Sequence, residues 1–185
     1  TIKNKKKFKS PYILWDSEIK DNLELIKIEF DEVMNSKIGL LKWLEKLHYY
    51  GIAILNNCPI ENKSALKILN KISHVRETFF GTPFEVINIP KPNNTAYTSD
   101  ALRNHTDLPY YEYAPGYQFL HCLINEATGG MSTAVDGFAV ANYLKKKDPK
   151  NFEFLINTHV KFKDDDYTQN KKRIFHAPII TLNKD

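Results

Sequence analysis

The hydrophobic pattern of the chain changes character near residue 84. Before that point, apolar residues recur at helical spacing in two segments, which predicts amphipathic helices over residues 37–50 and 62–73. Gly51 directly follows the first segment and favours a helix end there, because glycine adopts the left-handed backbone of a C-terminal cap. Residues 52–55 are all apolar and predict a short buried strand between the two helices.

Beyond residue 84 the pattern indicates short strands, broken by Pro90, Pro92, Pro109 and Pro115. One more helix is predicted over residues 137–147, where four apolar side chains share a face. A strand is expected at 133–135, and the charged residues 163–173 predict an exposed loop between strands. Helices followed by a strand-rich body predict an α+β chain with helices packed on a β-sandwich.

The charge of the chain is concentrated at its start. The net charge is +4 and the first nine residues carry five lysines, which leaves a balance of −1 for the remainder (4 − 5 = −1). A nucleic-acid-binding domain needs a basic face rather than a terminal run, so we expect no nucleic-acid partner. No apolar run approaches the roughly 18 residues of a membrane span. With two distant cysteines, Cys58 and Cys122, we expect reduced thiols and a cytoplasmic protein.

A candidate metal site lies in the segment Asn104-His105-Thr106-Asp107. If the segment is extended, His105 and Asp107 project to the same face, because side chains alternate along a strand. An imidazole nitrogen and a carboxylate oxygen then supply two of the three ligands of the 2-His-1-carboxylate site of non-haem Fe(II) oxygenases. By itself this short pattern is common and more typical of a solvated turn.

Four motifs in a fixed order strengthen the metal hypothesis: His105-Thr106-Asp107-Leu108-Pro109, Pro115-Gly116-Tyr117-Gln118-Phe119-Leu120-His121-Cys122-Leu123, Gly129-Gly130-Met131-Ser132-Thr133 and Val135-Asp136-Gly137-Phe138. Together they resemble the γ-butyrobetaine dioxygenase and trimethyllysine dioxygenase branch of the Fe(II)/2-oxoglutarate oxygenases, within the taurine-dioxygenase-like superfamily. The resemblance extends from about residue 36 to residue 185 and is densest from Asn93 to Phe138.

The resemblance implies a double-stranded β-helix, the jelly-roll oxygenase fold, of which this chain holds the N-terminal half. We expect residues 1–35 to be a basic linker and lead-in segment, and residues 36–185 to be a partial oxygenase domain. In the resembled family the second iron histidine and the arginine that binds 2-oxoglutarate lie farther along than residue 185. We therefore expect these 185 residues alone to be inactive and poorly soluble.

The resemblance also assigns roles to individual residues. It implies His105 and Asp107 as the catalytic Fe(II) ligands, and Ser132 as a contact of the co-substrate 2-oxoglutarate, with O₂ as the second co-substrate. From the residues alone, a simple hairpin turn is the favoured interpretation of Gly129-Gly130. The family resemblance makes the two interpretations equal. His121 lies in an apolar stretch and reads as a hydrogen-bonded core residue rather than a third ligand. The positions that line the substrate pocket in the family correspond to Phe80, Phe84, Asn94 and Tyr97.

The implied function is hydroxylation of a trimethylammonium substrate, with conversion of γ-butyrobetaine to L-carnitine as first choice. A quaternary ammonium has no N–H to donate and is recognised by aromatic faces. In the family the positions of Phe80 and Phe84 are often Tyr and Trp, so trimethyllysine or another betaine stays an alternative. Ordinary core packing is the alternative for the rings themselves. A non-catalytic jelly-roll binding module is the alternative of another class, and a homodimer is left open.

Overall fold

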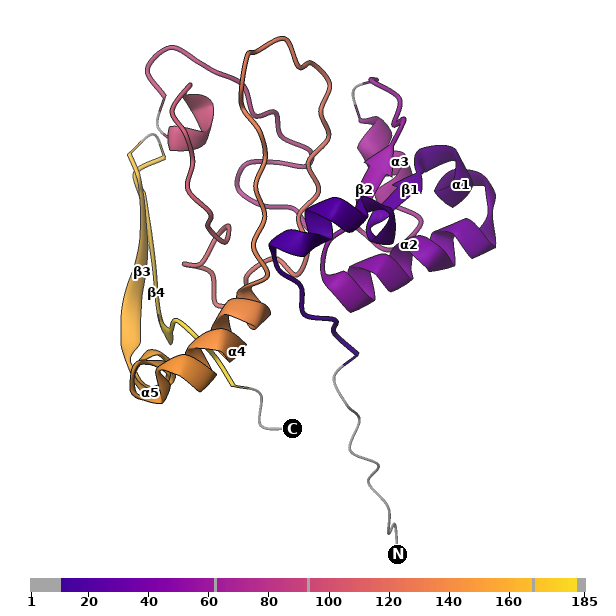
Figure 1. Cartoon of the computed structure of the whole chain (residues 1–185). Coiled ribbons are helices and arrows are strands. Elements are labelled where there is room, and N and C mark those ends of the chain that lie inside the picture. Colours follow the sequence, from indigo (N-terminus) through magenta and orange to yellow (C-terminus); the bar gives the residue numbers. More distant parts are fainter. Residues whose placement is uncertain (1–10, 62, 93, 168, 183–185) are drawn as a thin grey trace, which may run out of the picture. The chain divides into compact units, whose positions relative to one another are not determined.

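The structure is a computed structural model that describes residues 11–61, 63–92, 94–167 and 169–182 (Figure 1). The chain divides into two compact units, Thr1–Lys71 and Ile72–Asp185, which are described separately below. Within the described ranges no helix has the length and apolar character needed to cross a membrane.

The first unit is mainly helical. Its elements are η1 (Ser17–Leu25, a 3₁₀ helix), β1 (Lys27–Glu29), α1 (Phe30–Asn35), α2 (Lys37–Tyr50), β2 (Ile54–Asn56) and α3 (Ser64–Leu69) (Figure 1). The two strands pair in parallel, with Lys27 opposite Ile54 and Glu29 opposite Asn56. Parallel strands need a crossover connection, and here α1 and α2 supply it.

The prediction for residues 37–50 is confirmed in full by α2. The Ser36 hydroxyl accepts hydrogen bonds from the backbone N–H groups of Ile38 and Gly39, both at 3.2 Å, and so caps the N-terminus. Gly51 ends the helix in the left-handed region, at φ 69°. The second predicted helix is shorter than expected, because α3 covers Ser64–Leu69, and residue 62 lies outside the described residues.

The core of the first unit forms where α1, α2 and α3 meet the strand pair. Its buried members are Ile28, Phe30, Val33, Trp43 and Ile68. The two helices α1 and α2 come very close at Gly39, where an added Cβ would lie 2.1 Å from the carbonyl oxygen of Glu32. Glycine is therefore required here by the close approach of the two backbones.

Part of the expected lead-in over residues 1–35 is described in the structure. Residues 1–10 lie outside the described part. The backbone N–H of Ile13 donates to the Tyr49 carbonyl at 2.7 Å, and Trp15 Nε1 donates to the Tyr50 carbonyl at 2.9 Å. These contacts, together with β1 and α1, join residues 13–35 to the rest of the first unit, and the boundary at residue 35 stays a prediction.

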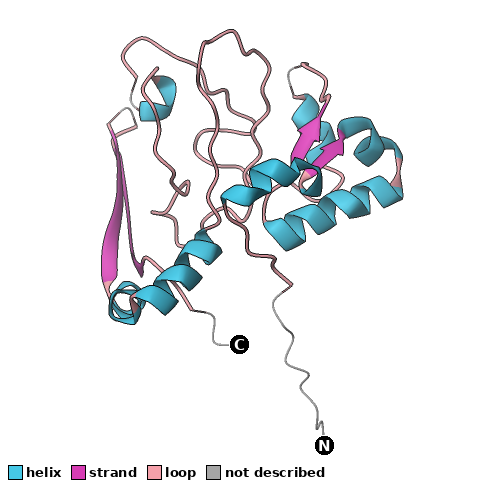
Figure 2. Cartoon of the chain, viewed as in Figure 1, coloured by secondary structure: helices cyan, strands magenta, loops and turns pink. Residues whose placement is uncertain are grey.

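The second unit begins with a long irregular segment, residues 72–136 (Figure 2). Its described regular element is η2 (Thr95–Tyr97), a single 3₁₀ turn, so the prediction of short strands after residue 84 is wrong for the described residues of this segment. The predicted strand at 133–135 is irregular as well. Strand pairing needs a partner from elsewhere in the chain, which period-2 patterning cannot supply.

Two helices and a hairpin follow the irregular segment. They are α4 (Gly137–Lys147), α5 (Pro149–Asn157), β3 (His159–Asp166) and β4 (Lys171–Pro178) (Figure 1). The prediction of a helix over 137–147 is confirmed, and Asp136 caps it by accepting from the backbone N–H groups of Phe138 and Ala139. Antiparallel pairing of β3 with β4 runs from His159 opposite Pro178 to Asp166 opposite Lys171.

The prediction of an exposed loop at 163–173 is wrong. Both ends of this range belong to strands, and the described residues between the strands, 167, 169 and 170, form a turn. The reason is electrostatic: Asp164 and Arg173 face each other in the register, and their side chains form an ion pair at 2.7 Å. Opposite charges directly across two strands stabilise the pairing, so a charged sequence here forms a hairpin.

Helices and strands together confirm the mixed α+β class. Within the described ranges the strands form two separate two-stranded sheets, and these do not make up a jelly roll. The jelly-roll expectation therefore continues to rest on the family resemblance.

Candidate metal and substrate site

The structure brings the side chains of His105 and Asp107 together. The distance from His105 Nε2 to Asp107 Oδ1 is 3.1 Å. The two residues lie in an irregular loop rather than a strand, and Leu108 follows at φ 54°, a left-handed turn conformation. Both side chains reach solvent, with exposed fractions of 52% and 38%. The i, i+2 relationship predicted from the sequence is therefore achieved by a loop.

A second partner orients each of these side chains. His105 Nδ1 lies 2.6 Å from the Arg103 carbonyl oxygen, which can only accept, so Nδ1 carries the proton. Gln118 Nε2 donates to Asp107 Oδ2. These bonds leave His105 Nε2 and Asp107 Oδ1 facing each other.

The donor set fits Fe(II). Two acceptor atoms facing each other at this separation need a positive charge between them, and that is either a proton on Nε2 or a metal ion. A histidine that donates its other ring nitrogen to a carbonyl is the usual arrangement at metal sites, because it fixes the tautomer and the ring orientation. Among the described residues, no group of three His, Cys, Asp or Glu side chains could hold a metal ion.

Ser132 lies in a loop that the structure ties to the metal pair. Gly129 and Gly130 both have positive φ, at 93° and 68°, so they form a turn that other residues would resist. One residue after Ser132, the Thr133 hydroxyl donates to Asn104 Oδ1 at 2.7 Å, and Asn104 directly precedes His105. Ser132 itself is exposed. The contact places the Ser132 loop beside the loop of His105 and Asp107, and the contact of Ser132 with 2-oxoglutarate stays a prediction.

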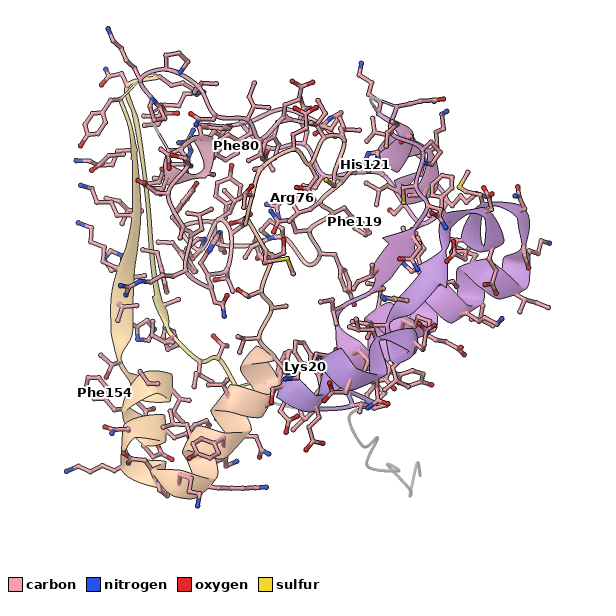
Figure 3. The ribbon with its side chains drawn as sticks, turned by 45° about the horizontal axis from the view of Figure 1, so that its top comes forward. Lys20, Arg76, Phe80, Phe119, His121 and Phe154 are labelled. Atoms are coloured by element: carbon pink, nitrogen blue, oxygen red, sulfur yellow. The ribbon has the colours of Figure 1, made fainter. Side chains whose placement is uncertain are left out.

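Two of the aromatic rings expected around the substrate, Phe80 and Phe84, form one stack with Phe79. The ring centroids of Phe79 and Phe80 are 4.1 Å apart, and those of Phe80 and Phe84 are 5.1 Å apart. Phe84 is 41% exposed, which is high for a large apolar side chain. Phe80 lies in the irregular segment of the second unit, as does Arg76 (Figure 3). Core packing therefore does not account for Phe84, whose ring is partly open to solvent.

Asn94 and Tyr97 occupy the two ends of η2. The Asn94 side chain accepts from the Ala96 backbone N–H at 2.9 Å and so caps this turn. Tyr97 is half-buried, and its carbonyl accepts from Ile89 at 3.1 Å. Among the described residues, the ring contacts given for Phe80 run to Phe79 and Phe84 and do not include Tyr97.

Arg173 is a residue that the sequence reasoning missed. Its guanidinium carbon lies 3.6 Å from the centroid of Phe79, and its Nη1 pairs with Asp164 at 2.7 Å. One face of Phe79 is therefore already occupied by a cation from β4. The signal was hidden because residues 163–173 look like a solvated charge run.

Tyr110 lies near enough to charged residues of the same hairpin and to Asp107 for their charges to affect its pKa. Burial, followed by the negative charge of Asp164, raises the pKa of Tyr110 to about 12, and Asp107 adds a smaller effect in the same direction. The nearby Arg173 lowers it in part. The Tyr110 and Tyr111 rings meet edge to face, with centroids 5.6 Å apart. No pattern in the sequence marks the proximity of Tyr110 to Asp164.

His121 differs from its expected environment. Its Nε2 is buried and has no hydrogen-bond partner among the described residues, whereas a hydrogen-bonded core histidine was expected. Its ring does not join the His105 and Asp107 pair in a metal-binding group within these residues. The interpretation of His121 as a residue that does not bind the metal stays a prediction.

Comparison with known proteins defines the class. The family described as "Taurine catabolism dioxygenase TauD, TfdA family" matches residues 16–184. The chain belongs to this family, which confirms the resemblance at family level and the expectation of a dioxygenase-type protein. The family implies the jelly-roll fold and the general use of Fe(II), 2-oxoglutarate and O₂.

The curated relatives come from both branches of the predicted group. A γ-butyrobetaine dioxygenase from Pseudomonas sp. (strain AK-1) is 38% identical over 161 residues, which is 87% of this chain and 42% of that protein. A mitochondrial trimethyllysine dioxygenase from Bos taurus is 36% identical over 85% of this chain and 37% of its own length. The Homo sapiens γ-butyrobetaine dioxygenase is 36% identical over 81% of this chain and 38% of its own length. The chain thus spans about two-fifths of the length of these relatives.

Proposed function

We propose that the full-length protein hydroxylates a trimethylammonium substrate at an Fe(II) site, with consumption of 2-oxoglutarate and O₂. The observation that carries this proposal is the convergence of His105 Nε2 and Asp107 Oδ1 within 3.1 Å, in a chain that belongs to a dioxygenase family. When bound, Fe(II) supplies the oxidising chemistry that breaks an unactivated C–H bond.

The residues of this chain would divide the remaining work. His105 and Asp107 hold the metal, and each is kept in orientation by a second hydrogen bond. Ser132 contacts 2-oxoglutarate from a loop anchored by Thr133 to Asn104. Phe80, Phe84, Asn94 and Tyr97 line the substrate pocket. Their task is to hold one C–H group near the metal and to exclude water.

The first-choice reaction is γ-butyrobetaine to L-carnitine. The relative with 38% identity carries the name γ-butyrobetaine dioxygenase, and this supports the choice. Trimethyllysine is the second candidate, because a relative of nearly equal identity carries that name. Both substrates have the same trimethylammonium group, so the ring stack of Phe80 and Phe84 serves either one.

The experiment compares substrates on the full-length protein. We expect kcat/KM to fall in the order γ-butyrobetaine, its dimethylamine analogue, and its neutral tert-butyl analogue. A desolvated cation–π contact contributes about 1–2 kcal/mol, so each ring lost is worth roughly tenfold. Equal turnover of the neutral analogue would refute an aromatic cage. Higher kcat/KM with trimethyllysine would retain the cage and replace the first-choice substrate.

A further inference from the structure

The two oxygens of the Asp107 carboxylate have different surroundings. Oδ1 lies 3.1 Å from His105 Nε2 and faces the proposed metal position. Oδ2 accepts a hydrogen bond from the side-chain amide of Gln118, which lies eleven residues farther along the chain. Because a carboxylate can only accept, the amide group presents its nitrogen to Asp107. The carboxylate is therefore held from one side and open on the other.

We propose that Gln118 is a positioning residue that fixes Asp107 as a one-oxygen ligand of the metal. This inference rests on the proposed function, since it needs a metal at His105 and Asp107. The Gln118 amide is uncharged, so it occupies Oδ2 without competing with the metal for the negative charge. Without this donor, the carboxylate can rotate about its χ2 bond, and Oδ1 is aimed at the metal for only part of the time.

His105 and Asp107 are each oriented by one hydrogen bond at the atom that points away from the proposed metal. His105 is fixed through Nδ1 by the Arg103 carbonyl, and Asp107 is fixed through Oδ2 by Gln118. Outer partners of this kind set the orientation of metal ligands, and their loss typically weakens metal affinity by about 10–100-fold. Gln118 is itself exposed, so its substitution should have little effect on the fold.

The test measures Fe²⁺ affinity of the full-length protein by anaerobic calorimetry, without 2-oxoglutarate or substrate. Gln118→Leu and Gln118→Met both remove the donor at similar side-chain size. We expect each variant to bind Fe²⁺ about 10–100-fold more weakly at an unchanged Tm. Gln169→Leu is the matched control, because Gln169 is an exposed glutamine in the hairpin turn. The Fe²⁺ affinity of this variant should equal that of the wild type.

Two outcomes would overturn the proposal. Wild-type Fe²⁺ affinity in both Gln118 variants would show that Asp107 needs no positioning. Unfolding of both variants would show that Gln118 supports the fold and not the ligand. His105→Ala separates this failure from that of the proposed function: if His105→Ala also binds Fe²⁺ normally, the metal site itself is wrong.

Discussion

The guanidinium carbon of Arg173 lies 3.6 Å from the ring centroid of Phe79. Phe79 in turn lies 4.1 Å from Phe80, centroid to centroid, so the two neighbouring rings have unequal surroundings. One face of Phe79 is taken by a cation that is itself paired with Asp164. Phe79 therefore has a structural role, and Phe80 and Phe84 remain as the rings that a substrate ammonium could contact.

This difference predicts opposite outcomes for two adjacent substitutions. Phe80→Leu should lower kcat/KM for γ-butyrobetaine about tenfold while leaving Tm nearly unchanged, because it removes a cation–π partner. Phe79→Leu should lower Tm and change kcat/KM less, because it breaks the contact with Arg173. Steady-state kinetics and thermal unfolding of the full-length protein measure both effects. If both substitutions affect kcat/KM equally, the two rings do not have separate roles.

The loop that carries Ser132 offers a second test. Thr133→Val removes the hydroxyl that donates to Asn104, and an exposed hydrogen bond of this kind contributes about 0.5–1.5 kcal/mol. We expect the KM for 2-oxoglutarate to rise roughly two- to tenfold, with kcat changed less. Thr181→Val, at an exposed threonine, is the control and should leave this KM unchanged. An unaltered KM in Thr133→Val would separate the loop from the co-substrate.

Substitution of Gly39 should strongly destabilise the first unit. A Cβ at this position would lie 2.1 Å from the carbonyl oxygen of Glu32, so Gly39→Ala must push α1 and α2 apart. Overpacking of this kind costs about 1–3 kcal/mol. Gly51→Ala is the control, because it meets nothing within 4 Å and only strains a backbone at φ 69°. Chemical denaturation should rank Gly39→Ala as the less stable variant, and the reverse order would contradict the close helix contact.

Tyr110 predicts a change of stability at alkaline pH. Burial and the charge of Asp164 raise the pKa of its phenol to about 12 in the folded state, against about 10 in an unfolded chain. The unfolded state therefore loses this proton first as pH rises. The contribution of Tyr110 to the free energy of unfolding is therefore complete below about pH 10 and decreases as the pH rises from about 10 towards 12.

Replacing the phenol removes this pH dependence. Tyr110→Phe should flatten the fall of Tm between about pH 10 and 12. Tyr113→Phe is the control, since Tyr113 is 73% exposed, and the wild-type slope should persist in it. An identical slope in Tyr110→Phe and the wild type would show that Tyr110 is not the group that titrates.

The sequence predicted features that depend on neighbouring residues. The bounds of α2 follow from helical spacing, the Ser36 cap and Gly51, all within one short segment. The pairing of His105 with Asp107 was found for the same reason, although a loop achieves it rather than the expected strand.

Contacts between distant residues were not predicted. The register of β3 with β4 depends on Asp164 meeting Arg173, and the charged segment alone looked like a loop. Gln118 meets Asp107 across eleven residues, and no local pattern marks that contact. The assignments of Ser132, Asn94 and Tyr97 came from the family resemblance, and they stay predictions.

Anaerobic Fe²⁺ titration of the full-length protein, followed by substrate-dependent turnover of 2-oxoglutarate, tests the central claim. His105→Ala and Asp107→Ala each remove one of the two ligand atoms, and His74→Ala changes an exposed histidine elsewhere in the second unit. We predict that the first two variants lose Fe²⁺ binding at one equivalent and lose turnover, whereas His74→Ala keeps both. Wild-type Fe²⁺ binding and turnover in His105→Ala would contradict the account.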